Sequence, residues 1–273
     1  MSESKPLMHR MPYGFGPAAG PRQDGNGAPF DWTDTPHRRA VAVSYLTDEA
    51  RLAALLPPGF SLADEPVVTV EIQYFTALQW LAGRGYNTLG VKFPATYQGE
   101  RETVTGLFLA VLWENLADPI LTGRDELGFA KLYAEIPEPR VLRGREIHGA
   151  AWLGHRFVDL ELDDIRDAAT PAPAQGSAAG GTLHYKYVPA TGDWGAADVA
   201  YACHTPPGAS RQRVLSASVA NGRVAFHPTT WEQMPTQFHI VQRLAALPVL
   251  ESRGASVTVT RGGKDLSDQR RIA

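Results

Sequence analysis

Lys131 is the residue of this sequence whose surroundings could make it reactive. It lies in the run GRDELGFAKLY, residues 123–133, where Phe129, Ala130 and Leu132 flank it and the three residues that follow include no acidic one. A free lysine has a pKa near 10.4, so only about one amine in a few thousand is unprotonated at neutral pH. Burial among apolar groups would favour the neutral amine, and a pKa of roughly 7 requires that the ammonium be destabilised by about 4 to 5 kcal/mol.

An unprotonated amine at position 131 would be a nucleophile toward ketones. Its attack on a ketone forms an imine, and the protonated imine withdraws electrons from the neighbouring carbon, which permits loss of carbon dioxide or addition to an aldehyde. The alternative is a surface lysine whose aliphatic stem lies on apolar neighbours. Taken alone, the segment favours this alternative, because lysines are mostly exposed.

Two short elements must position this lysine. Asp118 and Pro119 are typical of a helix start, with a capping residue followed by proline at the first helical position. Residues 132–136 are rich in hydrophobic and aromatic side chains and predict a strand. Lys131 is therefore expected at a joint between a helix and a strand.

The rest of the chain predicts many strands and about three helices. Residues 48–56 are expected to form a short helix that Thr47 and Asp48 cap, and a helix is expected within residues 230–247. Residues 141–147 and 151–162 are expected to form a hairpin about Gly149. The other expected strands are residues 41–45, 67–75, 89–97, 104–113, 183–188, 197–204, 213–219, 223–226 and 249–260. The sequence therefore predicts an α+β, mainly β fold that is barrel-like.

The chain is expected to hold one domain with two appendages. Residues 1–34 are rich in glycine and proline and predict an irregular arm, either disordered or lying across a neighbouring subunit. Residues 35–262 form the expected domain, within which residues 168–182 predict a low-complexity loop, and residues 263–273 a polar tail.

Composition excludes several classes of function. A net charge of −3 and a pI of about 6.2 do not favour nucleic acid or an anionic membrane as partner. The sequence has neither a signal segment nor a spanning apolar stretch, so we expect a cytoplasmic protein. One cysteine, Cys203, excludes internal disulfides and multi-cysteine metal sites. Phosphate-binding glycine motifs are missing, and no cofactor is expected.

Two other groups of residues carry weaker hypotheses. Asp159, Glu161 and Asp163 alternate along one predicted strand and could gather a hard cation, although such alternation is usually the solvated face. Cys203 and His204 place a potential nucleophile beside a potential base. Adjacent strand residues point to opposite faces, so a buried structural cysteine is favoured, and no metal site is expected.

With Lys131 as anchor, the sequence resembles the acetoacetate decarboxylase superfamily. The glycine, arginine and acidic residue at 123–125 stand at the family's separation from its imine-forming lysine. Further similar segments are YLTD at residues 45–48, LLPPGF at residues 55–60, DEPVVTVE at residues 64–71 and FPATYQG at residues 93–99. The resemblance covers about residues 36–139 and reverses the preference for a surface lysine.

The resemblance implies a fold and three site residues. It implies a β-barrel or cone with a few flanking helices, and a homo-oligomer. Lys131 would form the Schiff base, Glu71 would be the buried carboxylate near it, and Arg38 would face the substrate carboxylate, although the adjacent Arg39 would point the other way. Two positions depart from the pattern. Leu132 replaces a second lysine, and Thr88 replaces a second acidic residue.

These residues favour a cofactor-independent lyase in which Lys131 forms a Schiff base with a small keto acid. The carbon–carbon chemistry would be decarboxylation, or aldol addition of pyruvate to an aldehyde co-substrate followed by loss of water. Leu132 and Thr88 shift the preference away from plain acetoacetate decarboxylation, toward relatives that condense pyruvate with aldehydes or act on larger keto acids in secondary metabolism. The alternative is a non-catalytic protein that binds a small molecule on the same scaffold.

Overall fold

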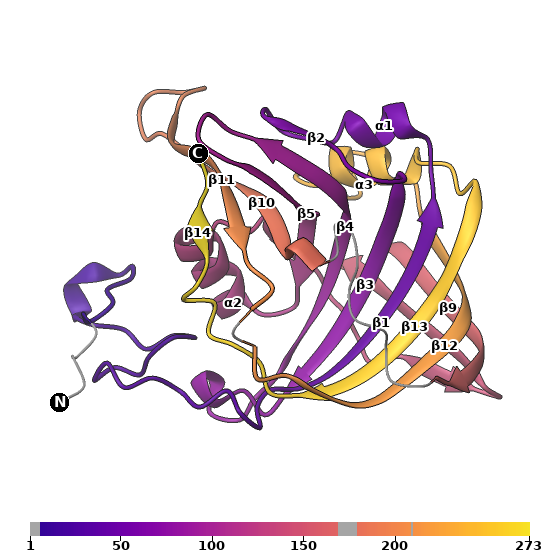
Figure 1. Ribbon diagram of the computed structural model, residues 1–273, viewed down its shortest axis with the longest axis horizontal. Coiled ribbons are helices and arrows are strands. Elements are labelled where there is room, and N and C mark those ends of the chain that lie inside the picture. The colour runs from indigo at the N-terminus through magenta and orange to yellow at the C-terminus, as the bar shows by residue number, and fades with distance from the viewer. Residues whose placement is uncertain (1–5, 169–178, 209) are drawn as a thin grey trace.

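A single strongly curved sheet organises the chain (Figure 1). The structure is a computed structural model and describes residues 6–168, 179–208 and 210–273. Among these residues the strands follow the order β14-β11-β10-β5-β4-β3-β1-β13-β12-β9-β8-β7, while β2 pairs with β4 and β6 pairs with β5. The strands are β1 (His37–Leu46), β2 (Phe60–Leu62), β3 (Val67–Thr76), β4 (Tyr86–Gln98), β5 (Thr103–Glu114), β6 (Lys131–Tyr133), β7 (Arg140–Leu142), β8 (Arg145–Trp152), β9 (His155–Asp167), β10 (Thr182–Pro189), β11 (Ala197–Thr205), β12 (Arg213–Phe226), β13 (Glu251–Arg261) and β14 (Arg270–Arg271).

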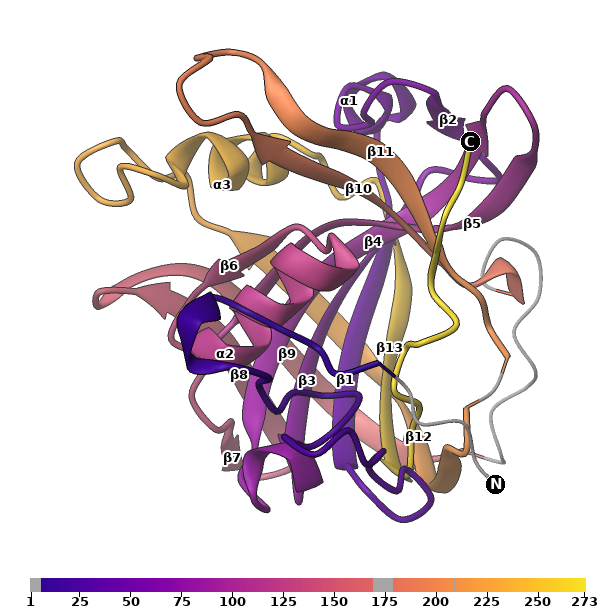
Figure 2. The ribbon, with the colours of Figure 1, turned by 90° about the vertical axis from the view of Figure 1, so that its left-hand side faces the viewer.

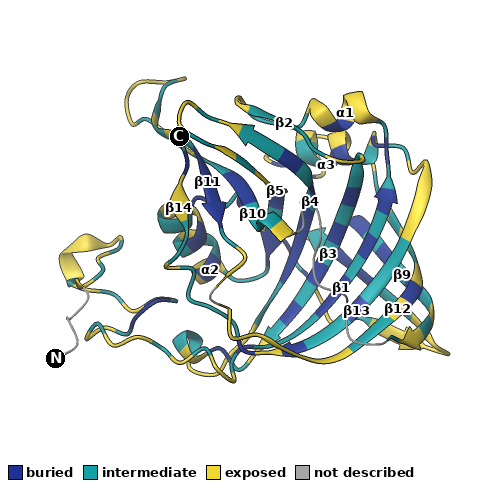
Figure 3. Cartoon of the chain, viewed as in Figure 1, coloured by how far each residue is buried: buried dark blue, intermediate teal, exposed yellow. Residues whose placement is uncertain are grey.

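The central strands are buried on one face and carry polar residues on the other. In β3, Val68, Val70, Ile72 and Tyr74 are buried in the core, and the residues between them are only half-buried (Figure 3). Successive side chains of a strand alternate between its faces, so Glu71 lies on the opposite face. The hydrophobic core occupies one side of this part of the sheet, and the other side is available for a site.

The helices are few and short. They are α1 (Glu49–Ala53), α2 (Ala117–Thr122), α3 (Phe238–Ala245), the 3-10 turns η1 (Tyr13–Phe15) and η2 (Gln79–Leu81), and the π-helical turn η3 (Gly123–Leu127). Asp48 caps α1 by accepting the Arg51 N–H. Both α1 and α3 lie at one end of the sheet (Figure 1). None of the helices in the described residues has the length and apolar character that crossing a membrane requires.

The part of the N-terminal arm that the structure describes packs against its own chain. Figure 2 shows the arm passing α2, and both Arg10 and Arg22 form ion pairs with Glu126 in η3. The tail also returns to the sheet, because β14 pairs with β11 and Ile272 is buried. Arm and tail therefore flank the segment that carries Lys131.

The mainly β fold is confirmed, with one refinement and three corrections. The sheet stays open between its edge strands β14 and β7 among the described residues, so it is a curved cone and not a closed barrel. The hairpin of β8 and β9 turns at Leu153 and Gly154, whose left-handed backbone suits a tight turn, and Gly149 lies inside β8. The two strands expected between residues 213 and 226 are one, β12, which absorbs register shifts.

The third correction concerns the helix before Lys131. Helix α2 begins at Ala117, so Asp118 and Pro119 lie in its first turn, with Leu116 at the cap position. Proline is tolerated there because the first N–H groups of a helix have no intrahelical acceptor. Most of the expected loop at residues 168–182 lies outside the described residues.

Candidate active site

Lys131 is the first residue of β6, directly after the α2 and η3 segment. It is 8% exposed. Its Nζ donates to the Pro119 carbonyl oxygen and forms an ion pair with Oε1 of Glu114, each at 2.9 Å. The Phe129 ring centroid lies 5.7 Å from the same nitrogen. The expected apolar surroundings are thus incomplete, because a buried carboxylate contacts the amine.

The η3 turn positions Lys131 in two ways: Arg124 binds the backbone of Lys131, and Gly123 has no side chain that would clash with it. Arg124 donates from Nη1 to the Lys131 carbonyl oxygen at 2.9 Å. A Cβ at Gly123 would overlap Cδ, Cε and Nζ of Lys131, so glycine makes room for the lysine side chain. Gly128 ends the turn with φ of +77°, a conformation that glycine adopts without strain.

His184 in β10 supports this turn from behind. Its ring stacks on Phe129 with centroids 4.2 Å apart, and its Nε2 donates to the Leu127 carbonyl oxygen at 2.9 Å. Burial lowers the pKa of His184 to about 4, so the ring is neutral at physiological pH and adds no positive charge beside Lys131.

Glu114 is the carboxylate that the structure brings to the amine. It is 1% exposed at the end of β5. Burial raises its pKa, although the Lys131 ammonium opposes the shift, and its Oε2 has no hydrogen-bond partner among the described residues. Burial and the Glu114 charge raise the pKa of Tyr86 well above its usual value, so the Tyr86 phenol stays protonated and can donate.

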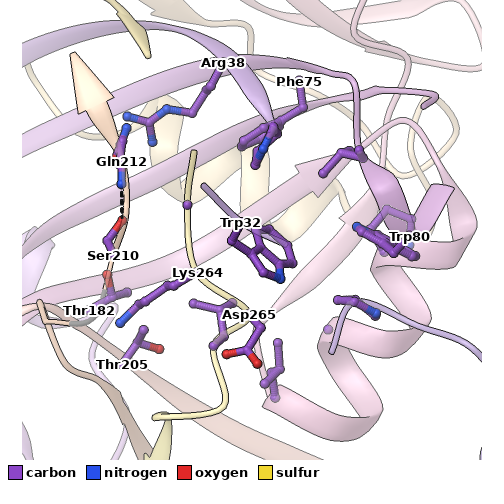
Figure 4. A pocket seen from close by; sticks show the side chains of 18 of the residues that line it. Trp32, Arg38, Phe75, Trp80, Thr182, Thr205, Ser210, Gln212, Lys264 and Asp265 are labelled. Atoms are coloured by element: carbon purple, nitrogen blue, oxygen red, sulfur yellow. Dashed lines mark hydrogen bonds between the residues drawn. The ribbon is translucent and has the colours of Figure 1, made fainter. Parts of the chain in front are cut away.

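A cavity of about 420 Å³ lies beside Lys131 on the face of the sheet opposite the core. Its size is within the range of small-molecule sites, about 300–1,000 Å³. Figure 4 shows its aromatic side chains Trp32, Phe75 and Trp80 across from the polar Gln212 and Thr205. The arm supplies Trp32 and the start of the tail supplies Gly263 and Lys264, so segments expected outside the domain contribute walls.

Arg38 lines this cavity, and Arg39 does not. Arg38 pairs with Phe75 across β1 and β3, whereas Arg39 lies on the opposite face and forms an ion pair with Glu146 at 2.6 Å. The Arg38 Nη1 donates weakly to Gln73 at 3.4 Å, and its Nε has no partner among the described residues. The guanidinium of Arg38 therefore has unused hydrogen-bonding capacity.

Glu71 lies on the same face of the sheet as Arg38, but Lys131 is not among its hydrogen-bond or ion-pair partners in the described residues. Its Oε1 accepts from Lys92 Nζ at 3.1 Å and from the Gln73 side chain. Burial acts to raise the pKa of Glu71, but Lys92 and Arg38 hold the pKa below its ordinary value. The carboxylate in contact with the amine is thus Glu114, while Glu71 balances the charges of Lys92 and Arg38.

The weaker candidates have structural partners. Asp159 is paired with Arg156 and His227, Glu161 with Arg145 and Arg223, and Asp163 accepts from Asn221. Groups of metal-binding side chains are absent from the described residues. Burial raises the pKa of the Cys203 thiol to about 11, so the thiolate nucleophile is disfavoured there.

Comparison with known protein families identifies the group to which this fold and site belong. The family model for acetoacetate decarboxylase matches residues 10–263. The chain belongs to the acetoacetate decarboxylase family. A comparison with curated protein sequences gives no significant match.

Solved structures of acetoacetate decarboxylase-like proteins share the fold. One acetoacetate decarboxylase structure is 16% identical with a TM-score of 0.65, over 86% of this chain and 87% of that one. The acetoacetate decarboxylase from Legionella pneumophila is 21% identical with a TM-score of 0.61, over 87% of each chain. The enduracididine biosynthesis enzyme MppR, complexed with the condensation product of pyruvate and imidazole 4-carboxaldehyde, is 17% identical with a TM-score of 0.61, over 98% of this chain and 99% of that one.

The structure shows the surroundings of Leu132 and Thr88, the two positions at which the resemblance implied a departure from the family's pattern. Leu132, in place of the second lysine, packs against the hydrophobic core. Thr88, in place of the second acidic residue, pairs directly with Glu114 across β4 and β5. A carboxylate is therefore present in this part of the site, but it comes from the neighbouring strand.

Sequence reasoning missed Glu114, Tyr86 and Trp32. The expected strand ended at Trp113, one residue before the carboxylate, and a single acidic residue that ends an apolar run was the available signal. Tyr86 precedes the expected strand, and Trp32 lies in an arm without hydrophobic periodicity. Their proximity follows from tertiary structure alone.

Proposed function

We propose that this protein forms a Schiff base between Lys131 and a keto acid and then performs carbon–carbon bond chemistry without a cofactor. The observation that carries the proposal is the buried contact between Lys131 and Glu114 beside a cavity of ligand size. Membership of the acetoacetate decarboxylase family supports it.

The contacts of Lys131 support a route to the reactive amine. Glu114 accepts a proton from the ammonium, and its raised pKa makes it a stronger base than an exposed carboxylate. The free amine adds to the substrate ketone, the resulting hydroxyl leaves as water after protonation, and the protonated imine remains. Tyr86, which lines the cavity as a protonated phenol, can donate a hydrogen bond to that oxygen.

Arg38 is the proposed partner of the substrate carboxylate. Its guanidinium lines the same cavity as Lys131 and has an unpartnered Nε among the described residues. Arginine suits this role because its planar fork matches a carboxylate. Glu71 holds Gln73, which in turn would orient Arg38. The negative charge of Glu71 would also weaken the attraction of Arg38 for anions.

The imine permits two outcomes. Loss of carbon dioxide from a 3-keto acid leaves an enamine, which gains a proton. Loss of a methyl proton from a pyruvate imine gives a similar enamine, which adds to an aldehyde carbon before water departs. In both, hydrolysis of the imine returns the amine. The cavity exceeds the needs of a small keto acid, which favours pyruvate with an aldehyde, or a larger keto acid, over acetoacetate.

Borohydride trapping tests the proposal. The protein is incubated with pyruvate or, separately, acetoacetate, reduced, and analysed by intact mass and peptide mapping. We expect an adduct on Lys131 and none in the Lys131→Ala variant. Lys264, the other lysine of the cavity, is the internal control, since its ammonium is held by Asp268 and two carbonyl oxygens.

The outcomes separate the candidate functions. Carbon dioxide released from acetoacetate would identify a decarboxylase, and a condensed product from pyruvate and an aldehyde would identify an aldolase. An adduct on Lys264 in place of Lys131 would contradict the role of Lys131. No adduct with pyruvate, acetoacetate or larger keto acids would contradict imine chemistry and favour a non-catalytic binding protein.

A further inference from the structure

Trp32 lines the cavity and is not part of the hydrophobic core. Its indole is half-buried, does not belong to the core cluster, and has an Nε1 without a hydrogen-bond partner among the described residues. A buried indole N–H usually finds an acceptor, so hydrogen bonding does not account for this placement. Figure 4 shows the ring in the middle of the lining side chains, toward Phe75 and Trp80.

Backbone contacts fix Trp32 at this place. Its carbonyl oxygen accepts from the Gly263 N–H at 2.9 Å, and a Cβ at Gly263 would lie only 3.2 Å from Cε3 of the indole. Asp31 donates its N–H to the Gln79 side chain at 3.0 Å. Gly263 therefore leaves space for the Trp32 indole, and Gln79 of η2 holds Asp31, the residue before Trp32.

Aromatic and cationic side chains line the same cavity. Trp32, Phe75, Trp80 and Tyr86 line it together with Lys131 and Arg38. Aromatic side chains favour aromatic ligands, since offset and edge-to-face contacts contribute about 0.5–1.5 kcal/mol beyond the burial of area. A ligand that contacts both kinds of side chain carries an aromatic ring and a carboxylate.

We infer that Trp32 is a specificity-determining residue and that the site takes an aromatic substrate, with a ring against Trp32 and a carboxylate toward Arg38. The inference rests on the proposed function for the placement of the reactive ketone near Lys131. The ring belongs either to the keto acid or to the aldehyde that joins it.

Calorimetry with two simple carboxylates tests this inference without any imine chemistry. The probes are 3-phenylpropanoate and propanoate, which share the carboxylate and lack a ketone. We expect the wild-type protein to bind 3-phenylpropanoate at least about tenfold more tightly, as burial of a phenyl group predicts. Trp32→Ala should reduce this ratio severalfold, whereas Trp32→Phe, which keeps an aromatic face, should retain most of it.

Two further variants make the result decisive. Trp194→Ala removes a tryptophan that is 88% exposed and does not line the cavity, and the ratio should be unchanged. Trp32→Leu keeps more volume and replaces Trp32→Ala if that variant does not fold. Equal affinity of the wild-type protein for the two acids, no binding of either, or an unchanged ratio without an aromatic residue at position 32 would overturn the inference.

Borohydride trapping of the same protein with pyruvate distinguishes this inference from the proposed function. An adduct on Lys131 without a preference for the phenyl group would overturn the inference alone. A preference that depends on Trp32, without an adduct from any keto acid, would support the aromatic subsite and contradict the imine.

Discussion

Lys131 and Glu114 are each buried, and each satisfies the charge of the other. A buried ion pair is costly to desolvate and is weak evidence for a stabilising role. Replacing one partner leaves the other charge uncompensated. The pair is better explained by chemistry, because a carboxylate in contact with an amine can take and return its proton.

The choice between Glu114 and Glu71 can be tested with matched isosteric variants. Glu114→Gln should lower the rate of borohydride-trapped imine formation about 10²–10⁴-fold, since loss of a general base has this magnitude. Glu71→Gln should have a smaller effect, because Glu71 contacts Lys92 and Gln73, whereas Glu114 contacts the amine itself. Melting temperatures would verify that both variants are folded. A larger loss in Glu71→Gln would assign the base to Glu71.

Among the elements, the continuous run of α2 and η3 is what places the lysine. The π-helical turn, a feature frequent at functional sites, brings Gly123 alongside the lysine side chain. Gly123 has helical dihedrals, with φ of −69° and ψ of −37°, so the backbone conformation at position 123 does not require glycine. It is required by the space that Lys131 occupies.

Gly123→Ala should therefore separate activity from stability. Alanine suits helical backbone better than glycine by about 1 kcal/mol, and the flexible end of Lys131 can move away from the new methyl group. Moving Nζ also weakens its buried contact with Glu114, which opposes the gain from alanine. We therefore expect a melting temperature within a few degrees of the wild-type value and at least about a tenfold loss of imine trapping. Gly25→Ala, which meets no atom within 4 Å, is the control and should match the wild-type protein in both. If Gly123→Ala trapped the imine as well as the wild-type protein, the reaction of Lys131 would not depend on the space beside Gly123.

The sequence predicted the secondary-structure elements better than the contacts between them. The hydrophobic residues of β1, β3, β4 and β5 were sufficient to predict those strands, and the segment pattern placed Lys131 at the joint where β6 begins. The partner of Lys131 depends on the register of β4, β5 and β6, which pairs Thr88 with Glu114 and Leu112 with Lys131. No local pattern encodes that register, so the sequence did not indicate Glu114.

At the scale of the whole molecule, the two faces of the sheet are covered differently. One face packs the core together with α1 and α3, whose Leu52 and Val241 are buried in it. The other is covered by segments of low regularity: the arm, the α2 and η3 run, and the start of the tail. None of the buried hydrophobic residues of the core precedes Ala40 among those described, so the arm contributes to the pocket and not to the hydrophobic core.

Deleting residues 1–30 should therefore weaken the pocket and spare the fold. The deletion removes Arg10 and Arg22, the ion-pair partners of Glu126, and it removes Pro21 from the lining of the cavity. The contacts of Trp32 with Gly263 and of Asp31 with Gln79 remain. We expect an unchanged circular dichroism spectrum, a melting temperature lower by only a few degrees, and at least severalfold weaker binding of 3-phenylpropanoate by calorimetry. Arg22→Gln keeps the arm but removes one charge, and should give a smaller loss of the same sign. A deletion variant that fails to fold would mean that the arm is part of the stable core, and one that binds normally would remove the arm from the pocket.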